Sequence, residues 1–203
     1  MENRYEVGRR AIKNIIGDML IVVMAGGKSS RMGFEKPLAL VRGKPMLLWV
    51  YDRAVKAGDA VVAVSRNTPR TAEFCKERGI ETIETSGKGY VEDIRFILKE
   101  FGEFVSVACD IPFVRAEDIR EIVENFEGMS LTGVLSPKIV PDFIDLKKLP
   151  IYEGWVIVGL NAVGWEGEMF LELKNPLLAL NVNTPEDLAL ANTIANKLDT
   201  SWA

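Results

Sequence analysis

Short apolar runs alternate with segments of helical periodicity between Met19 and Asn125, and this alternation restricts the fold more than any other feature of the sequence. The apolar runs have the length of buried strands and predict strands at Met19–Met24, Ala60–Ser65, Glu81–Glu84 and Phe104–Ala108. The segments that follow them predict helices at Lys44–Ala57, Thr68–Arg78, Val91–Phe101 and Ala116–Asn125. This order of elements predicts an open, mainly parallel sheet with helices on both faces.

The second half of the sequence has a different pattern. It predicts strands at Ser130–Leu135, Trp155–Trp165 and Leu177–Val182, with an irregular stretch before the second of them. A closing helix is predicted at Pro185–Leu198, with Thr184 as its N-cap. We therefore predict an α/β fold, a Rossmann-like, mainly parallel open sheet with a small added β-subdomain, over residues 19–203.

Residues 1–18 are predicted to be an N-terminal helical extension. Tyr5–Ile16 carries an apolar stripe that would pack on the domain or on a second copy in a homodimer. Met19 is the first residue of the first predicted strand, so translation from that residue is the alternative. The sequence leaves both readings open.

Composition excludes several classes of protein. The net charge is −4 and no run of Lys or Arg occurs, so no nucleic-acid surface is predicted. We expect no membrane span and no signal peptide, because the apolar stretches near the start are too short. The two cysteines, Cys75 and Cys109, predict reduced thiols in a cytoplasmic protein. The chain has no histidine, which excludes Ser-His and Cys-His hydrolases and His-ligated zinc enzymes.

A Gly-rich loop at residues 24–37 directly follows the first predicted strand and is the strongest functional signal. Gly26 and Gly27 let the backbone approach a polyanion and direct N–H groups at it. Lys28, Arg31 and Lys36 supply the positive charge that a triphosphate requires. The spacing matches neither the dinucleotide-binding fingerprint nor the P-loop. The alternative to a triphosphate site is a glycine turn with solvated basic side chains.

Asp110 follows the predicted strand Phe104–Ala108, at the edge of the sheet where the Gly-rich loop also lies. A carboxylate there can hold Mg²⁺ against phosphate oxygens, or it can cap the next helix. Asn181 and Asn183 lie on one side of the last predicted strand. Their amide oxygens would complete a metal shell, or the segment would only cap the closing helix.

Two further loops are candidates for contact with a base. The segment Thr85–Asp93 has glycines, hydroxyls and a lysine at a helix entrance, which suits an anion or a base but also a well-capped loop. The segment Ser65–Thr68 ends a predicted strand. Within it, Asn67 has an amide that can read a base edge or cap a turn.

The motif Ala-Gly-Gly-x-x-x-Arg-Met-Gly at 25–33, followed by Lys36 and Pro37, resembles the nucleotidyltransferases with a glycosyltransferase-A-like fold. That superfamily includes the molybdenum cofactor guanylyltransferases. Later motifs are similar to the archaeal GTP:adenosylcobinamide-phosphate guanylyltransferases, at Ser65–Pro69, Thr85–Asp93, Gly159–Asn161 and Asn181–Thr184. The molybdenum enzymes usually have Gly-Gly-x-Asp-Lys where this chain has Gly33-Phe34-Glu35-Lys36, which weighs against that branch.

The resemblance implies a role for each of these loops. It implies nucleotide contacts at Met24, Ala25, Gly26, Gly27, Lys28, Ser29, Arg31, Lys36, Ser65, Asn67, Thr85, Ser86 and Gly87. Arg31, Lys36 and Asp110 would be the catalytic residues, and Mg²⁺ would be the cofactor, bound by Asp110 and Asn183. Gly159 and Asn161 would lie at the acceptor.

The expected reaction is the transfer of GMP from GTP to the phosphate of adenosylcobinamide phosphate, with release of pyrophosphate. The alternatives are a molybdenum cofactor guanylyl- or cytidylyltransferase, a sugar-phosphate nucleotidyltransferase, and, in another class, a non-catalytic GTP-binding module. The presence of both Lys36 and Asp110 favours an enzyme, because a sensor needs affinity but no metal ion at the α-phosphate.

Overall fold

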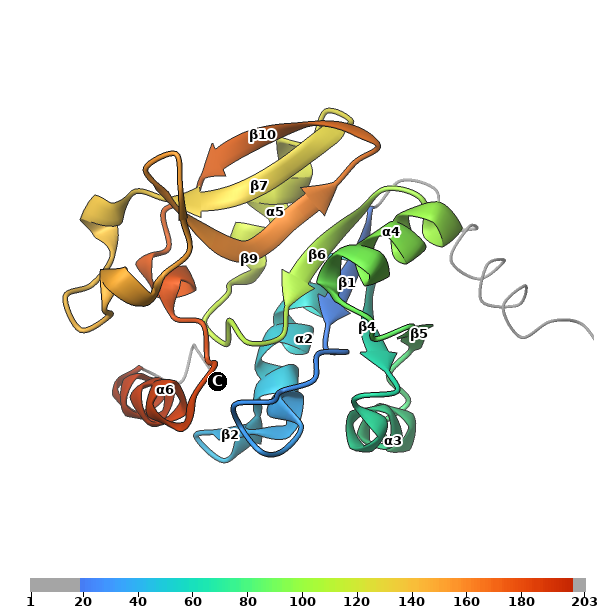
Figure 1. Cartoon of the computed structure of the whole chain (residues 1–203), viewed down its shortest axis with the longest axis horizontal. Helices are drawn as coiled ribbons and strands as arrows, with labels where there is room; N and C mark the ends of the chain where they lie inside the picture. Colours follow the sequence, from blue (N-terminus) through green and yellow to red (C-terminus); the bar gives the residue numbers. More distant parts are fainter. Residues whose placement is uncertain (1–18, 199–203) are drawn as a thin grey trace, which may run out of the picture.

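The first strand, β1 (Leu20–Met24), lies inside the sheet between two parallel neighbours. These are β4 (Ala60–Ser65) and β6 (Phe104–Ala108), and β5 (Thr82–Thr85) continues the parallel order beyond β4. The computed structural model describes residues 19–198, and Figure 1 shows these strands with their helices. The parallel half of the predicted sheet is confirmed.

The strands of the second half join the same sheet. The long β9 (Trp155–Val163) runs antiparallel to β6 and to β7 (Met129–Leu135), and β10 (Glu166–Glu172) lies beyond β7 in parallel to it. The order is β10-β7-β9-β6-β1-β4-β5, and β8 (Ile151–Tyr152) pairs with β9. The predicted α/β fold is therefore confirmed, and its added strands extend the central sheet on the β9 side.

Helices cover both faces of the parallel strands. Ile21 and Val23 of β1 lie in the large core with α2 (Met46–Ala57), α3 (Pro69–Glu77) and α5 (Ala116–Glu124). Leu20 and Val22 point to the opposite face and pack with α4 (Tyr90–Phe101). This alternation follows from the period of two in a strand. It explains why the run Leu20–Met24 is apolar throughout, since both of its faces are buried.

The remaining elements are short, apart from the closing helix. A two-stranded sheet is formed by β2 (Leu40–Val41) and β3 (Lys44–Pro45). The 3₁₀ helices are η1 (Lys36–Leu38), η2 (Pro137–Ile139), η3 (Leu146–Lys148) and η4 (Pro176–Ala179). The closing helix is α6 (Pro185–Lys197), where Thr184 accepts a hydrogen bond from Asp187 N as the predicted N-cap. No helix within residues 19–198 is long and apolar enough to cross a membrane.

Two predictions about local structure were wrong, and one strand was missed. Leu177–Val182 is not a strand: Pro176 starts η4, the Asn175 side chain accepts a hydrogen bond from Leu177 N, and the following residues pair with no strand. The predicted helix at Lys44 starts only at Met46, because Lys44 and Pro45 pair with β2. β10 was missed because its exposed glutamates break the apolar pattern of a buried strand. The predicted extension at residues 1–18 lies outside the described residues.

Candidate functional site

The Gly-rich loop leaves β1 at the carboxyl end of the parallel strands and curls back on itself. Ser29 has a φ of 50°, and its Oγ accepts a hydrogen bond of 3.0 Å from Lys36 N. Gly33 turns the loop with a φ of 73°, a conformation that favours glycine. At the start of the loop, the Gly26 carbonyl accepts a hydrogen bond of 2.7 Å from Ser65 Oγ. Lys36 therefore lies close to the residues with which the loop begins.

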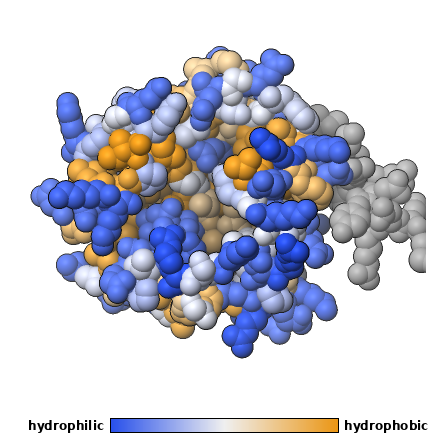
Figure 2. Space-filling view, in the orientation of Figure 1, coloured by the Kyte–Doolittle hydropathy of each residue, from blue (hydrophilic) through white to orange (hydrophobic). Residues whose placement is uncertain are grey.

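A cavity of about 410 Å³ opens beside this loop. Its wall comes from the Gly-rich loop, the turn after β4, the loop before α4 and the end of β6: Met24, Ala25, Gly26, Gly27, Lys28, Ser29, Lys36, Pro37, Asn67, Thr85, Gly87, Lys88, Gly89, Tyr90, Asp93, Ala108, Cys109 and Asp110. Figure 2, drawn in the orientation of Figure 1, shows that the surface is hollowed near the centre of the view and that hydrophilic side chains border the hollow. This volume lies within the usual range for small-ligand sites.

The charged side chains of the predicted site meet at one end of this cavity. Lys36 forms an ion pair with Asp110 and donates a hydrogen bond of 3.0 Å to Asn183 Oδ1. Arg31 Nη2 donates to the same Asn183 oxygen, also at 3.0 Å. The Lys36 and Asp110 side chains are each only 15% exposed, so water screens their charges less than on an open surface. The prediction that the loop and the carboxylate share one edge of the sheet agrees with this geometry.

The backbone holds Asn183 at this position. Val182 N donates a hydrogen bond of 2.8 Å to the Asp110 carbonyl, which fixes the segment before α6 against the end of β6. Asn183 Nδ2 donates to Asn181 Oδ1 at 2.9 Å, so the two amides predicted to share a side do touch. The segment is thus part of the site although it is not a strand.

One carboxylate oxygen of Asp110 has no hydrogen-bond partner among residues 19–198 and suits a divalent cation. Its Oδ1 is buried and accepts no hydrogen bond from residues 19–198. Within these residues no cluster of three or more His, Cys, Asp or Glu side chains forms a metal site. A Mg²⁺ ion held by one carboxylate, phosphate oxygens and water needs no such cluster. Asp110 therefore fits the predicted ligand role. Asn183 Oδ1 already accepts hydrogen bonds from Lys36 and Arg31, and it would have to lose them before it could bind a metal ion.

The other end of the cavity is built from the two loops that were predicted to contact a base. Asn67 Nδ2 donates hydrogen bonds to the Gly87 carbonyl (2.8 Å) and to the Gly26 carbonyl (3.4 Å). Ser65 Oγ also accepts a hydrogen bond from Asn67 N at 3.0 Å. In this structure Ser65 and Asn67 brace the wall of the cavity, and the Asn67 amide does so by joining two loops that are distant in the sequence rather than by capping its own turn.

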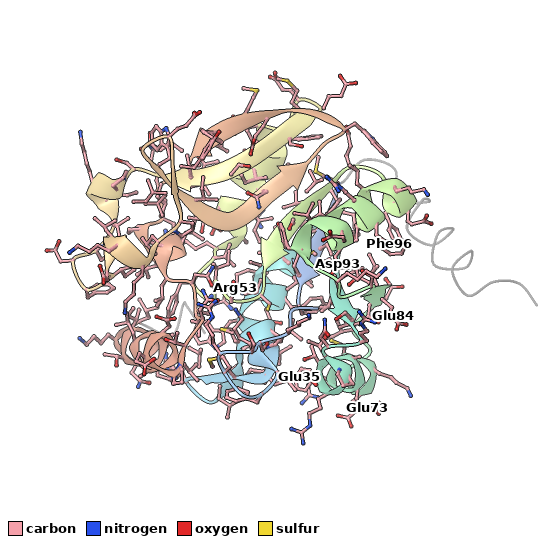
Figure 3. The ribbon with its side chains drawn as sticks, viewed as in Figure 1. Glu35, Arg53, Glu73, Glu84, Asp93 and Phe96 are labelled. Atoms are coloured by element: carbon pink, nitrogen blue, oxygen red, sulfur yellow. The ribbon has the colours of Figure 1, made fainter. Side chains whose placement is uncertain are left out.

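The loop before α4 depends on a carboxylate that sequence reasoning did not assign. Asp93 is 5% exposed, and its Oδ1 accepts hydrogen bonds of 3.1 Å from Gly87 N and from Ser86 Oγ (Figure 3). Thr85 Oγ1 donates to the Val64 carbonyl at 3.2 Å. The hydroxyls of Thr85 and Ser86 therefore shape the loop. Asp93 lies in the first turn of α4, and its acidic character there was the available signal.

The predicted acceptor residues lie on the face of the sheet beside α4. A Cβ at Gly159 would stand 2.5 Å from Ala108 Cβ, so β9 and β6 approach closely there. Asn161 Nδ2 donates to the Tyr90 hydroxyl at 3.4 Å, and that hydroxyl shares a hydrogen bond of 2.9 Å with Ser106 Oγ. Burial of this hydroxyl raises the pKa of Tyr90, although half of the residue's surface remains exposed. Tyr90 was not among the predicted site residues.

Three comparisons with known proteins agree with this geometry. Residues 21–138 match the family model described as a MobA-like NTP transferase domain. The chain is 31% identical over 200 residues to an adenosylcobinamide-phosphate guanylyltransferase of Methanocaldococcus jannaschii, covering 87% of this chain and 97% of that protein. It is 26% identical to a probable molybdenum cofactor guanylyltransferase of Nostoc sp., covering 86% and 91% of the two chains.

A solved structure supports the fold. The molybdopterin-guanine dinucleotide biosynthesis protein A of Archaeoglobus fulgidus superposes with a TM-score of 0.66 and covers 89% of this chain and 100% of its own. The two sequences are 20% identical, so this likeness concerns the fold alone.

Proposed function

Because the chain belongs to the MobA-like NTP transferase family and is a nucleotidyltransferase, we propose that it transfers GMP from GTP to the phosphate of adenosylcobinamide phosphate. The observation that carries this proposal is the meeting of Arg31, Lys36 and Asp110 beside a cavity lined by the Gly-rich loop. The relative from Methanocaldococcus jannaschii, matched over 97% of its length, supports the choice of acceptor.

In this reaction a phosphate oxygen of the acceptor attacks the α-phosphorus of GTP. The new bond joins that oxygen to the α-phosphorus, and the bond from the α-phosphorus to the bridging oxygen breaks. Pyrophosphate leaves with the bridging oxygen and its electron pair. A phosphate monoester has a second pKa near about 6, so at neutral pH it is already a nucleophile and needs no general base. This agrees with a chain that has no histidine.

The side chains supply position and charge. Lys36 and Arg31 would exchange their hydrogen bonds to Asn183 for phosphate oxygens, since both donors already converge on one acceptor. Gly27 lines the cavity and leaves room for the triphosphate, because a Cβ there would meet nothing within 4 Å. Phosphoryl-type transfer depends mainly on such positioning and on charge neutralisation.

A bound Mg²⁺ ion would be held by Asp110 Oδ1 and would neutralise charge on the phosphate oxygens. The unpaired buried oxygen supports this role, because burying a carboxylate oxygen without a partner costs folding free energy. We propose that Asn183 joins this arrangement through its own amide oxygen once Lys36 turns to the nucleotide.

The guanine base would occupy the end of the cavity between Met24, Asn67 and the loop at 85–89. The Gly87 and Gly89 carbonyls each accept one hydrogen bond, from Asn67 Nδ2 and from Asp93 N, and each keeps a second lone pair that a donor on the base edge could use. Ser65 and Asn67 would act indirectly, because their side chains already hold the backbone of that wall.

A second candidate is a molybdenum cofactor guanylyltransferase. Relatives with that name match 84 to 86% of this chain at 26 to 29% identity. The two candidates share the GTP site and differ in the acceptor, so only the acceptor separates them.

The test is an acceptor panel. Purified protein is mixed with Mg²⁺ and GTP labelled at the α-phosphate, and label transfer and pyrophosphate release are measured with adenosylcobinamide phosphate, with molybdopterin and without acceptor. We expect release above the no-acceptor control only with adenosylcobinamide phosphate. Transfer to molybdopterin alone would favour the second candidate. GTP binding without transfer to either acceptor would favour a non-catalytic module.

A further inference from the structure

Glu35 reaches from the end of the Gly-rich loop to the start of α3 (Figure 3). Its Oε1 accepts a hydrogen bond of 2.9 Å from Arg70 N. Its Oε2 accepts hydrogen bonds of 2.6 Å from Thr71 N and 2.7 Å from Thr71 Oγ1. Both carboxylate oxygens are therefore engaged by a helix that lies 35 residues further along the chain.

Glu35 takes the place of a local side-chain cap at the start of α3. Thr68 stands at the N-cap position of α3, yet its side chain makes no capping hydrogen bond. Its Oγ1 instead accepts from Ser65 N at 3.1 Å and donates to the Ser65 carbonyl at 3.3 Å. The first N–H groups of a helix need outside acceptors, and a carboxylate there also interacts favourably with the helix dipole. The first turn of α3 obtains this acceptor from the Gly-rich loop.

The same short stretch, residues 65–71, thus holds both ends of the Gly-rich loop. Ser65 Oγ holds the Gly26 carbonyl at the start, and the N–H groups of Arg70 and Thr71 hold Glu35 at the end. Between these two attachments the loop is mostly exposed, at Gly27, Lys28, Ser30, Arg31, Gly33 and Phe34. The loop is therefore fixed at its ends and open to solvent in its middle.

The attachment at Glu35 lies next to Lys36 in the chain, and Lys36 directs its ammonium group to Asp110 and Asn183. We propose that Glu35 is a positioning residue, which holds the Lys36 backbone so that its side chain meets the phosphates of the bound nucleotide. This inference rests on the proposed nucleotidyl transfer. Glu35 itself touches no reacting group, because both of its oxygens face α3.

The test measures binding of GTP and of guanosine to the whole chain, without acceptor, by calorimetry. Glu35→Ala should lower the affinity for GTP by about tenfold, because Lys36 loses its fixed position. The affinity for guanosine should stay within about twofold of the wild-type value. Glu35→Gln keeps one acceptor oxygen and should give a smaller loss. Glu73→Gln removes an exposed carboxylate from α3 and is the matched control, with no change for either ligand.

A double-mutant cycle identifies Lys36 as the residue through which Glu35 acts. In a Lys36→Ala background, Glu35→Ala should lower the affinity for GTP no further. Full additivity of the two losses, or equal losses for GTP and guanosine, would overturn the proposal and leave Glu35 as a helix cap only. If Glu35→Ala does not fold, Thr71→Val removes one of the three hydrogen bonds and should weaken GTP selectively to a lesser extent.

The outcome does not depend on which acceptor or base the chain uses. If the acceptor panel releases no pyrophosphate, the proposed transfer fails while the binding comparison still stands. If the wild-type chain binds another nucleoside triphosphate better than GTP, the triphosphate and nucleoside of that base serve in the same cycle. Selective loss of the triphosphate then supports the positioning role, and equal loss of both ligands overturns it.

Discussion

Replacing Gly87 by alanine tests how closely the wall of the cavity is fitted. Gly87 has a φ of 63°, and a Cβ added there would stand 2.4 Å from Asn67 Nδ2 and 2.6 Å from Ser65 Oγ. These two side chains hold the Gly26 and Gly87 carbonyls. Gly79 is a matched control: its φ is 65°, but a Cβ there meets nothing within 4 Å.

The two variants share one cost and differ in another. The left-handed conformation costs a non-glycine residue about 1–2 kcal/mol, and both variants carry that penalty. At Gly87 the new methyl group must also displace Asn67 or Ser65, with the loss of one or two hydrogen bonds worth about 1 kcal/mol each. We therefore expect Gly87→Ala to lower the free energy of unfolding by about 2–4 kcal/mol and Gly79→Ala by about 1–2 kcal/mol.

The assay combines urea unfolding with nucleotide binding. Gly87→Ala should weaken GTP binding by about tenfold or more, because the displaced Asn67 no longer holds the loop at 85–89 that lines the cavity. Gly79→Ala should bind GTP as the wild-type chain does, since Gly79 lies at the far end of α3. Equal unfolding free energies and equal GTP affinities for the two variants would refute this reasoning.

Three further outcomes are expected. Asp110→Asn should reduce pyrophosphate release by about 100-fold or more, and activity within about threefold of wild type would contradict its role in charge neutralisation. Burial raises the pKa of Asp118 above 3.8, so its protonated form favours the folded state, and the resulting stability is lost as pH rises through that raised pKa. Relative to that of Asp118→Asn, the urea midpoint of the wild-type chain should therefore fall as the pH rises above about 4, and a pH-independent difference between the two midpoints would contradict this expectation. Burial raises the pKa of Cys75 to about 11 and that of Cys109 to about 12, so a thiol reagent at about pH 8 should label neither before unfolding, and fast labelling of the native chain would disprove this.

The parallel half of the fold was predictable because its signals are local. The strand Phe104–Ala108 has the predicted bounds, since apolar residues that face both sides of a sheet form an unbroken run. The convergence of Lys36 and Asp110 was predictable for a related reason, because parallel strands bring their carboxyl ends to one edge.

The features that escaped prediction depend on contacts between distant residues. Leu178, Leu180 and Val182 are buried as strand residues would be, but Asn175 and Pro176 turn the chain into η4 instead. Glu35 caps a helix that begins more than thirty residues later, which no pattern around either segment indicates. Asp93 resembles an ordinary first-turn acidic residue, and only the fold of the loop at 85–89 buries it.

The cluster of Arg31, Lys36 and Asn183 joins residues separated by 147 to 152 positions. Asn183 is therefore synthesised 147 residues after Lys36, and until then both cations lack their shared amide oxygen. Until then the nascent protein can carry its Gly-rich loop and the carboxylate after β6, but the segment that runs along Asp110 has not emerged. A product that stopped near residue 138, where the family match ends, would keep the recognisable motif and lack the amide on which Arg31 and Lys36 converge.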